Sequence, residues 1–64
     1  IRRGDSGNIT WLIQAALYTR GYTTVIPDGI FGPATDAAVR EFQRDQGLTV
    51  DGVAGPNTQD RLFR

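Results

Sequence analysis

The stretch Asp28-Gly29-Ile30-Phe31-Gly32-Pro33-Ala34-Thr35 decides the fold of this 64-residue chain, because it occurs twice. It returns as Asp51-Gly52-Val53-Ala54-Gly55-Pro56-Asn57-Thr58, at an offset of 23 residues (51 − 28). Asp-Gly indicates a turn, since the carboxylate can accept nearby backbone N–H groups and glycine adopts φ > 0 without steric cost. Gly-Pro indicates a helix start, where proline lacks only an N–H that has no intrahelical partner. Each of these turn blocks therefore predicts a turn that leads into a helix.

The residues ahead of the two blocks extend the repeat. Ile13-Gln14 lies in a helical pattern that ends at Gly21-Tyr22, and Phe42-Gln43 lies in one that ends at Gly47-Leu48. Helix, glycine stop, short link and turn block thus occur twice in the same order, and the first copy is longer. Two unequal copies are too few for a solenoid, which needs at least three. The sequence therefore predicts a small, internally duplicated globule.

Composition limits the classes of protein that this chain can represent. Its length allows one domain with one small core. Seven basic residues balance seven acidic ones, which argues against nucleic acid as the main partner. There is no cysteine, no signal sequence and no apolar run long enough to span a bilayer. We expect a single module, residues 1–64, excised from a longer protein and acting as a monomer with no membrane or nucleic-acid partner.

Helical periodicity predicts three helices, at about residues 8–20, 33–46 and 56–63. Gly21 and Gly47 are expected to end the first two helices, while Asp5, Ser6 or Asn8 could cap the first. The side chains expected to face the core are Ile9, Leu12, Ile13, Ala16 and Leu17 of the first helix, Ala34, Ala38, Val39 and Phe42 of the second, and Leu62 of the third.

The segments between these helices carry the turn blocks. The β-branched run 23–26 reads as an extended link. Ile30 and Val53 are expected to turn inward as apolar anchors, with Phe31 as a second candidate. The predicted fold class is therefore all-α: a small three-helix bundle with an internal pseudo-repeat and two Asp-Gly…Gly-Pro turn loops.

An aromatic stripe does not belong to the predicted core. At 100° per residue, Trp11 and Tyr18 share the side of the first helix opposite Ile13 and Leu17, and Tyr22 could extend the stripe. These rings either tuck against a neighbouring loop or form an exposed platform. A platform would suit sugars, whose C–H faces pack on aromatic rings.

The chain lacks the side chains of the common catalytic centres. It has no histidine and no cysteine, which excludes the usual zinc-hydrolase ligand sets, Cys–His nucleophiles and Ser–His–Asp triads. Its one glutamate, Glu41, reads as part of a solvated helix face, and Asp28 and Asp51 read as turn and cap residues. The Gly-x-x-Gly spacings match no phosphate-binding fingerprint. We therefore predict a non-catalytic module with no metal and no cofactor.

Taken together, these motifs resemble the type 1 peptidoglycan-binding domain over essentially the whole chain. The resemblance is carried by residues 4–7, Ile13-Gln14, Leu17, Gly21-Tyr22, the two turn blocks, Ala38-Val39, Phe42-Gln43, Gly47-Leu48 and Leu62. It implies a three-helix fold attached to bacterial or phage cell-wall hydrolases such as amidases, lytic transglycosylases, muramidases or peptidases. Thr10 departs from the pattern, which has an aliphatic residue there, and its hydroxyl could bond to a carbonyl one turn earlier.

The resemblance implies that the module binds peptidoglycan, through the glycan or the stem peptides, and targets a covalently linked catalytic domain to its polymer. It implies action outside the cell, in the wall or periplasm, or delivery there by a phage. Gln14, Gln43, Thr35 and Thr58 are interpreted as bracing residues of the loops. The expected ligand contacts are Tyr22, Phe31, Tyr18 and Trp11 for the sugar faces, and Arg20, Arg40, Arg44, Asp28 and Asn57 for polar groups.

Two other functions stay open from the residues alone. A regulatory, prodomain-like module is one, although metalloprotease propeptides of similar shape use a cysteine that this chain lacks. A protein–protein adaptor that uses the Trp11 and Tyr18 stripe is the other. Binding to purified cell-wall sacculi would separate the wall-binding function from the adaptor.

Overall fold

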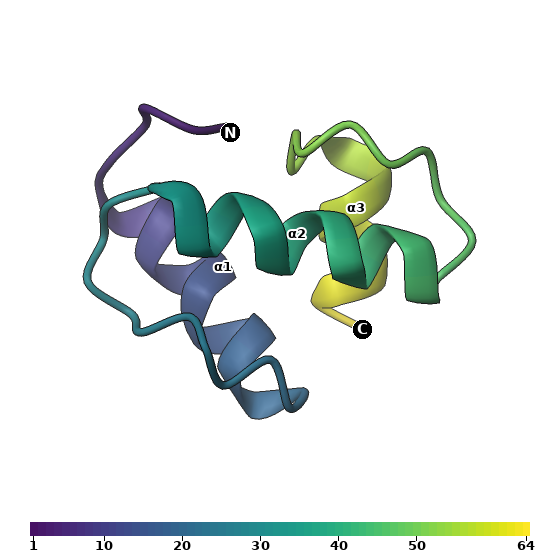
Figure 1. Ribbon diagram of the computed structural model, residues 1–64, viewed down its shortest axis with the longest axis horizontal. Coiled ribbons are helices and arrows are strands. Elements are labelled where there is room, and N and C mark those ends of the chain that lie inside the picture. The colour runs from purple at the N-terminus through teal and green to yellow at the C-terminus, as the bar shows by residue number, and fades with distance from the viewer.

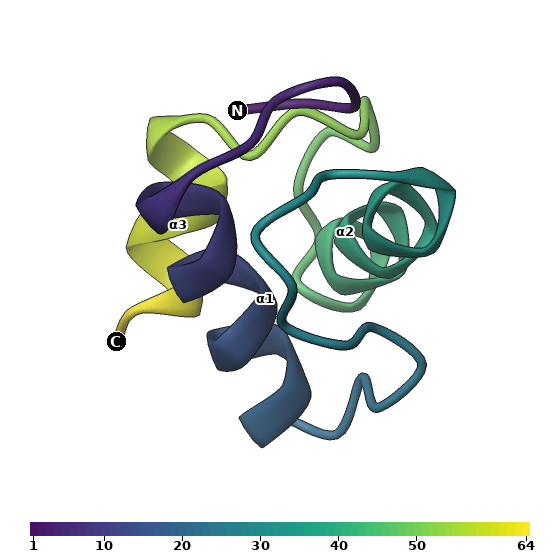
Figure 2. The same ribbon diagram turned by 90° about the vertical axis from the view of Figure 1, so that its left-hand side faces the viewer.

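The computed structural model describes residues 1–64 and contains three helices, in the order α1 (Asn8–Thr19), α2 (Pro33–Asp45) and α3 (Pro56–Leu62). α1 packs against both α2 and α3. α2 runs along the long axis of the molecule (Figure 1), and the turned view shows α1 and α3 side by side with α2 nearly end-on (Figure 2). The predicted all-α bundle is confirmed, and the only β pairing is an isolated bridge between Ser6 and Ile30. None of the helices has the length and apolar character needed to cross a membrane.

Glycines end the first two helices as predicted. Gly21 has φ 102° and Gly47 has φ 70°. After each glycine the next backbone N–H reaches back to the helix: Tyr22 N donates to the Leu17 carbonyl at 3.0 Å, and Leu48 N donates to the Gln43 carbonyl at 2.8 Å. Both ends are therefore Schellman motifs, in which a glycine with positive φ lets the chain turn back and satisfy carbonyls of the last turn.

The helix starts also follow the Gly-Pro signal. Pro33 and Pro56 occupy the first positions of α2 and α3, and the N-cap residues are glycines without side-chain caps. Gly7 is the N-cap of α1, again without a side-chain cap. The expectation that Asp5, Ser6 or Asn8 caps α1 is therefore wrong. The Asp5 carboxylate instead accepts the backbone N–H of Arg2 at 2.9 Å.

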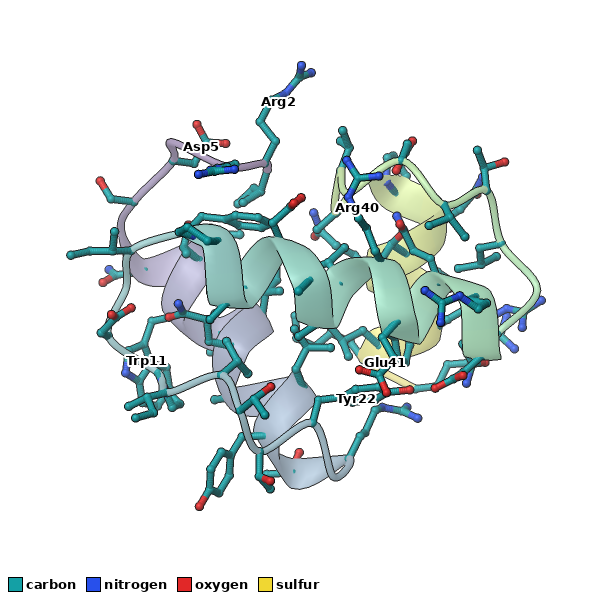
Figure 3. The ribbon with its side chains drawn as sticks, viewed as in Figure 1. Arg2, Asp5, Trp11, Tyr22, Arg40 and Glu41 are labelled. Carbon is teal, nitrogen blue, oxygen red and sulfur yellow. The ribbon has the colours of Figure 1, made fainter.

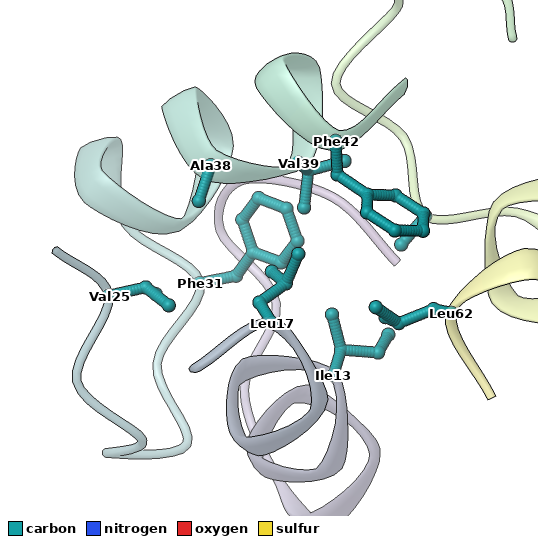
Figure 4. Close-up of a cluster of buried hydrophobic side chains, with 9 residues drawn as sticks. Ile13, Leu17, Val25, Phe31, Ala38, Val39, Phe42 and Leu62 are labelled. Atoms are coloured by element: carbon teal, nitrogen blue, oxygen red, sulfur yellow. The ribbon is translucent and has the colours of Figure 1, made fainter. Parts of the chain in front are cut away.

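The core contains nine buried apolar side chains, most of which are visible in Figure 4. They are Ile13, Leu17, Val25, Phe31, Ala38, Val39, Phe42, Ala54 and Leu62. The buried face of α1 differs from the prediction, since Ile9 and Leu12 are 50% and 47% exposed. Thr10 and Gln14 are buried instead. The polar contacts of Gln14, described below, fix this rotation of the helix.

The inward residue of each turn block is also shifted by one position. Ile30 is 62% exposed, whereas Phe31 and Ala54 are buried. Ile30 uses its backbone to close the turn, so its side chain faces outward and the next side chain faces the core. Ala34 is exposed as well, and Thr35 is buried in its place. The link after α1 begins with a turn in which Val25 N donates to the Tyr22 carbonyl, so its first half is not extended.

The N-terminal segment joins the two copies. Phe31 N donates to the Asp5 carbonyl at 2.8 Å, and Gly7 N donates to the Gly29 carbonyl at 2.9 Å. Ala54 N, in the second turn block, donates to the Ile1 carbonyl at 2.7 Å. Residues 1–7 therefore make backbone contacts with both blocks, and the N-terminus lies beside the second one (Figure 2).

Candidate functional site

The side-chain amide of Gln14, on α1, holds the first turn block in place. Its Oε1 accepts the backbone N–H groups of Asp28 and Gly29 at 3.1 and 2.8 Å. Its Nε2 lies 3.0 Å from Asp28 Oδ1, 2.9 Å from the Ile30 carbonyl oxygen and 2.9 Å from Thr35 Oγ1. Ile30 N also donates to Asp28 Oδ1 at 2.9 Å, which closes an Asx turn. We call this set of contacts the first glutamine clamp.

Gln43, on α2, holds the second turn block with the same set of contacts. Its Oε1 accepts the N–H groups of Asp51 and Gly52, each at 3.1 Å. Its Nε2 lies 2.9 Å from Asp51 Oδ1, 3.0 Å from the Val53 carbonyl oxygen and 3.1 Å from Thr58 Oγ1. Val53 N donates to Asp51 Oδ1 at 2.9 Å. Every hydrogen bond of the first clamp thus has its counterpart in this second glutamine clamp.

The clamps fix the charge of the two aspartates. The backbone N–H of Ile30 lowers the pKa of Asp28 below its ordinary value, with the Gln14 amide as the next cause. The N–H of Val53 and then the Gln43 amide do the same for the pKa of Asp51. Both carboxylates are therefore ionised at neutral pH, because hydrogen bonds to the charged form favour it. The prediction that the glutamines and threonines brace the loops is confirmed.

A groove lies beside each clamp. The second groove has a volume of about 470 Å³ and is lined by Gln43, Gly47, Leu48, Thr49, Asp51, Val53, Gly55, Pro56, Asn57 and Thr58. The first groove has a volume of about 290 Å³ and is lined by Thr24, Val25, Ile26, Asp28, Ile30, Gly32, Pro33, Ala34 and Thr35. Every residue of the first groove lies 23 positions (51 − 28) before a residue that lines the second. The two grooves are therefore the same structural feature, repeated at opposite ends of α2.

The two grooves share four lining residues at equivalent positions but differ in other side chains. Asp, Gly, Pro and Thr recur at four equivalent positions. Ile26 in the first groove corresponds to Thr49 in the second, and Ala34 corresponds to Asn57. At these two positions the first groove is therefore aliphatic, whereas the second offers an exposed hydroxyl and an exposed amide. The first groove has its own exposed hydroxyl at Thr24, where the second groove has Gly47.

A third hollow, of about 260 Å³, lies between the N-terminal segment, α2 and the second turn block. Arg40 lines it with Arg2, Arg3 and Asp36. Arg40 is paired with Asp36 at 3.4 Å and donates to the Asp51 carbonyl at 3.3 Å. Figure 3 shows Arg40 on the side of α2 that faces the second block. This expected ligand contact thus braces the back of the second loop.

Phe31 cannot serve as an exposed platform for a sugar. Its side chain is only 1% exposed and belongs to the core. The reason is the alternation noted above: Ile30 faces outward, so the next residue faces inward. The expectation that Phe31 contacts the ligand is therefore corrected.

The other three aromatic candidates divide into two groups. Trp11 and Tyr18 are 47% and 48% exposed on the outer side of α1, where Figure 3 shows Trp11. Tyr22 is half-buried and packs edge-on against Phe42, with ring centroids 5.8 Å apart. Its hydroxyl donates to Asp45 Oδ2, so Tyr22 joins the link after α1 to the end of α2 and does not extend the stripe.

The remaining polar candidates lie in different places. Arg20 donates to the carbonyls of Leu62 and Arg61 at 3.2 and 2.9 Å, so it caps the C-terminal end of α3. Asp28 and Asn57 line the first and second grooves, and Arg44 is exposed on α2. The structure does not bring the candidates together into one site.

Of the residues that line the grooves, only Asp28 and Asn57 were expected ligand contacts, and Leu48 and Thr49 are among those that the sequence reasoning missed. Both lie in the short link before the second turn block, and they correspond to Val25 and Ile26. The signal was present, because aligning the two copies places a hydroxyl where the first copy has an aliphatic side chain. No group of His, Cys, Asp or Glu side chains gathers where it could hold a metal ion.

Comparison with known proteins places this architecture in a described family. The family described as "Putative peptidoglycan binding domain" matches residues 6–62. The chain is 54% identical over 66 aligned positions to a zinc D-Ala-D-Ala carboxypeptidase of Streptomyces albus G, a match that covers 100% of this chain and 26% of that enzyme. It is 42% identical over 64 residues to a spore cortex-lytic enzyme of Bacillus cereus, covering 100% of this chain and 25% of that enzyme.

A solved structure agrees with the sequence relatives. The crystal structure of a peptidoglycan-binding protein from Clostridioides difficile superposes with a TM-score of 0.97 at 44% identity. That match covers 100% of this chain and 40% of the other. The chain spans about a quarter of the length of the curated relatives described above.

Proposed function

The chain belongs to the family of peptidoglycan-binding domains, and from that premise we propose that it binds bacterial peptidoglycan and holds an attached hydrolase on its polymeric substrate. One observation carries this proposal: the family match runs from residue 6 to residue 62 and includes both turn blocks. The whole chain is thus accounted for by a non-catalytic binding module. The chemistry belongs to another part of a longer protein, an amidase, muramidase, transglycosylase or peptidase.

The geometry suits a module that works on a polymer. Two preformed grooves flank α2, whose 13 residues span about 20 Å at 1.5 Å per residue. Weak contacts are sufficient when a ligand repeats many times, because rebinding to neighbouring units raises the overall affinity. We propose that the module acts as a monomer in the cell wall or periplasm, or is delivered to the wall by a phage. Of the expected contacts, Asn57, Asp28, Arg44, Trp11 and Tyr18 have side chains exposed to such a ligand.

Co-sedimentation with purified sacculi tests the proposal. The folded chain is expected to sediment with the sacculi, to be released by soluble wall fragments, and to liberate no fragments itself. Circular dichroism of the unbound fraction shows whether the chain is folded. A folded chain that stays in the supernatant at every sacculus concentration would overturn the proposed function.

A second candidate function is supported by the exposed side of α1. Trp11 and Tyr18 are about half exposed there, and neither belongs to the core. Such a surface suits a protein partner, since tryptophan and tyrosine supply much of the binding energy at protein interfaces. If this is the main role, Trp11→Ala with Tyr18→Ala will abolish binding to the partner while wall sedimentation stays unchanged.

A further inference from the structure

We propose that the second groove is a sugar site, and that it takes an uncharged acetamido group of the glycan rather than a carboxylate of the stem peptides. This inference rests on the proposed function, because it names the part of peptidoglycan that the module reads. It is carried by the side chains of the second groove and by their contrast with the first.

The polar groups available to a ligand in this groove are few. Gln43, Asp51 and Thr58 bind one another within the second glutamine clamp. Asn57 and Thr49 are exposed at the edge of the groove. The Asn57 amide offers both a donor and an acceptor, which pair with the C=O and N–H of an acetamido group. The Thr49 hydroxyl can pair with a sugar hydroxyl.

The charge of the groove selects against carboxylates. Asp51 is its only ionisable lining residue, and the clamp keeps it ionised. A carboxylate of a stem peptide would meet a like charge there, whereas a neutral amide or hydroxyl would not. The charge of Arg40 helps to keep Asp51 ionised, but Arg40 lines the neighbouring hollow, where it is paired with Asp36, and does not line the groove itself.

The apolar part of the groove completes the fit. Leu48 and Val53 are half-buried and are the only two hydrophobic residues of the lining. They can cover the methyl of an acetamido group while its polar atoms face Asn57. The loop that carries Val53 is already fixed by the clamp, so ligand binding does not have to order it, which lowers the entropic cost of association.

The first groove is a natural comparison within the same molecule. It has the same clamp and the same frame, but Ile26 and Ala34 replace Thr49 and Asn57. It therefore lacks the amide, and its exposed hydroxyl, on Thr24, lies at the position of Gly47 rather than at that of Thr49. Replacing Thr49 and Asn57 by their counterparts removes the hydroxyl and the amide at these two positions and leaves the clamp intact.

The experiment compares the wild-type chain with the double variant Thr49→Ile/Asn57→Ala. Both are titrated by NMR with a β-1,4 tetramer of N-acetylglucosamine, with the matching tetramer of glucose, and with a free stem peptide. We expect the wild-type chain to bind the N-acetylglucosamine tetramer, with shifts at residues 47–58. We expect the double variant to bind it at least about tenfold more weakly, the loss of one good hydrogen bond or more. The glucose tetramer and the stem peptide should bind at least about tenfold more weakly than the acetylated sugar.

Ile26→Ala, in the first groove, is the matched control and should bind like the wild type. The site assignment is wrong if Ile26→Ala weakens sugar binding as much as the double variant does, or if the shifts lie elsewhere. It is also wrong if the stem peptide binds the second groove better than the acetylated sugar. Sacculus sedimentation separates the two proposals: a double variant that sediments as well as the wild type overturns this inference alone. A wild-type chain that does not sediment overturns the proposed function.

Discussion

Two buried glutamine side chains carry much of the polar structure of this domain. Each amide contacts a backbone pair, a carboxylate, a carbonyl and a threonine hydroxyl. A hydrogen bond contributes about 1 kcal/mol net, but a buried group that loses its partner costs about 1–3 kcal/mol. The clamps therefore stabilise the fold mainly because their loss would leave several buried polar groups without a hydrogen-bond partner.

Replacing Gln14 or Gln43 by leucine is expected to lower the free energy of unfolding by about 3 kcal/mol or more, because several loop groups lose their partner together. A domain of this size has only a few kcal/mol of stability, so either variant should be largely unfolded at room temperature. Urea unfolding followed by circular dichroism measures the loss. Gln46→Leu, just beyond α2, is the control and should change stability by less than about 0.5 kcal/mol. Equal stability of all three variants would show that the clamps are not needed.

Thr10 is expected to be a weak point of the core. Its side chain is fully buried, and Oγ1 has no hydrogen-bond partner, contrary to the expected bond to a carbonyl one turn earlier. Thr10→Val keeps the shape and removes the unpaired hydroxyl, which should raise stability by about 1 kcal/mol. That corresponds to a rise in Tm of about 4–8 °C for a domain this small. A fall in Tm would mean that the hydroxyl has a partner in solution.

Gly52 and Gly29 are expected to differ in their tolerance of alanine. Both have positive φ, 74° and 80°, so each alanine costs about 1–2 kcal/mol in backbone strain. A Cβ at Gly52 would also collide with the side chains of Asp36 and Arg40, whereas at Gly29 it would lie 3.6 Å from the Gly7 carbonyl oxygen. Gly52→Ala should therefore be the more destabilising change in thermal melts. In an Asp36→Ala/Arg40→Ala background the difference between the two glycines should shrink; if it persists, the collision with these two side chains is not its cause.

At the scale of the elements, the C-terminal end of each helix is tied to a neighbouring element. Arg20, at the end of α1, donates to the last carbonyls of α3 and lies 5.6 Å from the centre of the Phe42 ring. Tyr22, in the link after α1, donates to Asp45 at the end of α2. Seven-residue α3 is too short to be stable alone, and these contacts fix it and α2 to α1.

The Tyr22–Asp45 contact makes this junction sensitive to high pH. Burial, and then the hydrogen bond to Asp45, raise the pKa of Tyr22 from 10.0 to about 12. The protonated phenol is thus favoured in the folded state, so its contribution is complete below pH 10.0 and is lost as the pH rises towards about 12. Stability measured by urea unfolding should fall over that range. Tyr22→Phe should remove most of this fall, whereas Tyr18→Phe, on the exposed side of α1, should retain it.

At the scale of the whole molecule, the fold is two copies of one unit joined by the N-terminal segment. Both copies depend on an ionised aspartate at the same place in their clamps, so acid acts on both ends of the molecule together. The pKa of Asp28 and of Asp51 is lowered from the ordinary value of 3.8. A lowered folded-state pKa contributes stability above the unfolded value, which is lost as the pH falls through the folded one.

We therefore expect stability to decrease below a pH of about 4. Asp28→Asn with Asp51→Asn should still fold at neutral pH, because asparagine also forms Asx turns, but should lose much of this acid dependence. Chemical unfolding at several pH values between 2 and 7 measures it. An acid dependence as steep as that of the wild type would place its origin in other carboxyls.

Local signals allowed much of this fold to be predicted. Helical periodicity, Gly-Pro starts and glycine stops located the three helices to within a residue or so, because they act within one turn of the chain. The predicted buried face of α1 was correct at Ile13 and Leu17 but wrong at Ile9 and Leu12. The helix is rotated because Gln14 is drawn inward by partners 14–21 residues away. Ile30 was likewise expected to face inward, but its backbone is held by Gln14 and Asp28, so its side chain faces outward and Phe31 is buried instead. The grooves depend on how three segments meet, so the sequence showed some of their residues but not their grouping.

The residues of the clamps and the exposed residues of the grooves are separate sets, and this has a practical consequence. In each groove, the residues that bind the glutamine hold the loop in place. The exposed positions 26 and 34 of the first groove, and 49 and 57 of the second, take no part in these contacts. These four sites can be randomised in a library without touching the contacts that keep the chain folded. A scaffold of 64 residues with no cysteine then offers two independent recognition surfaces for selection against the walls of chosen bacteria.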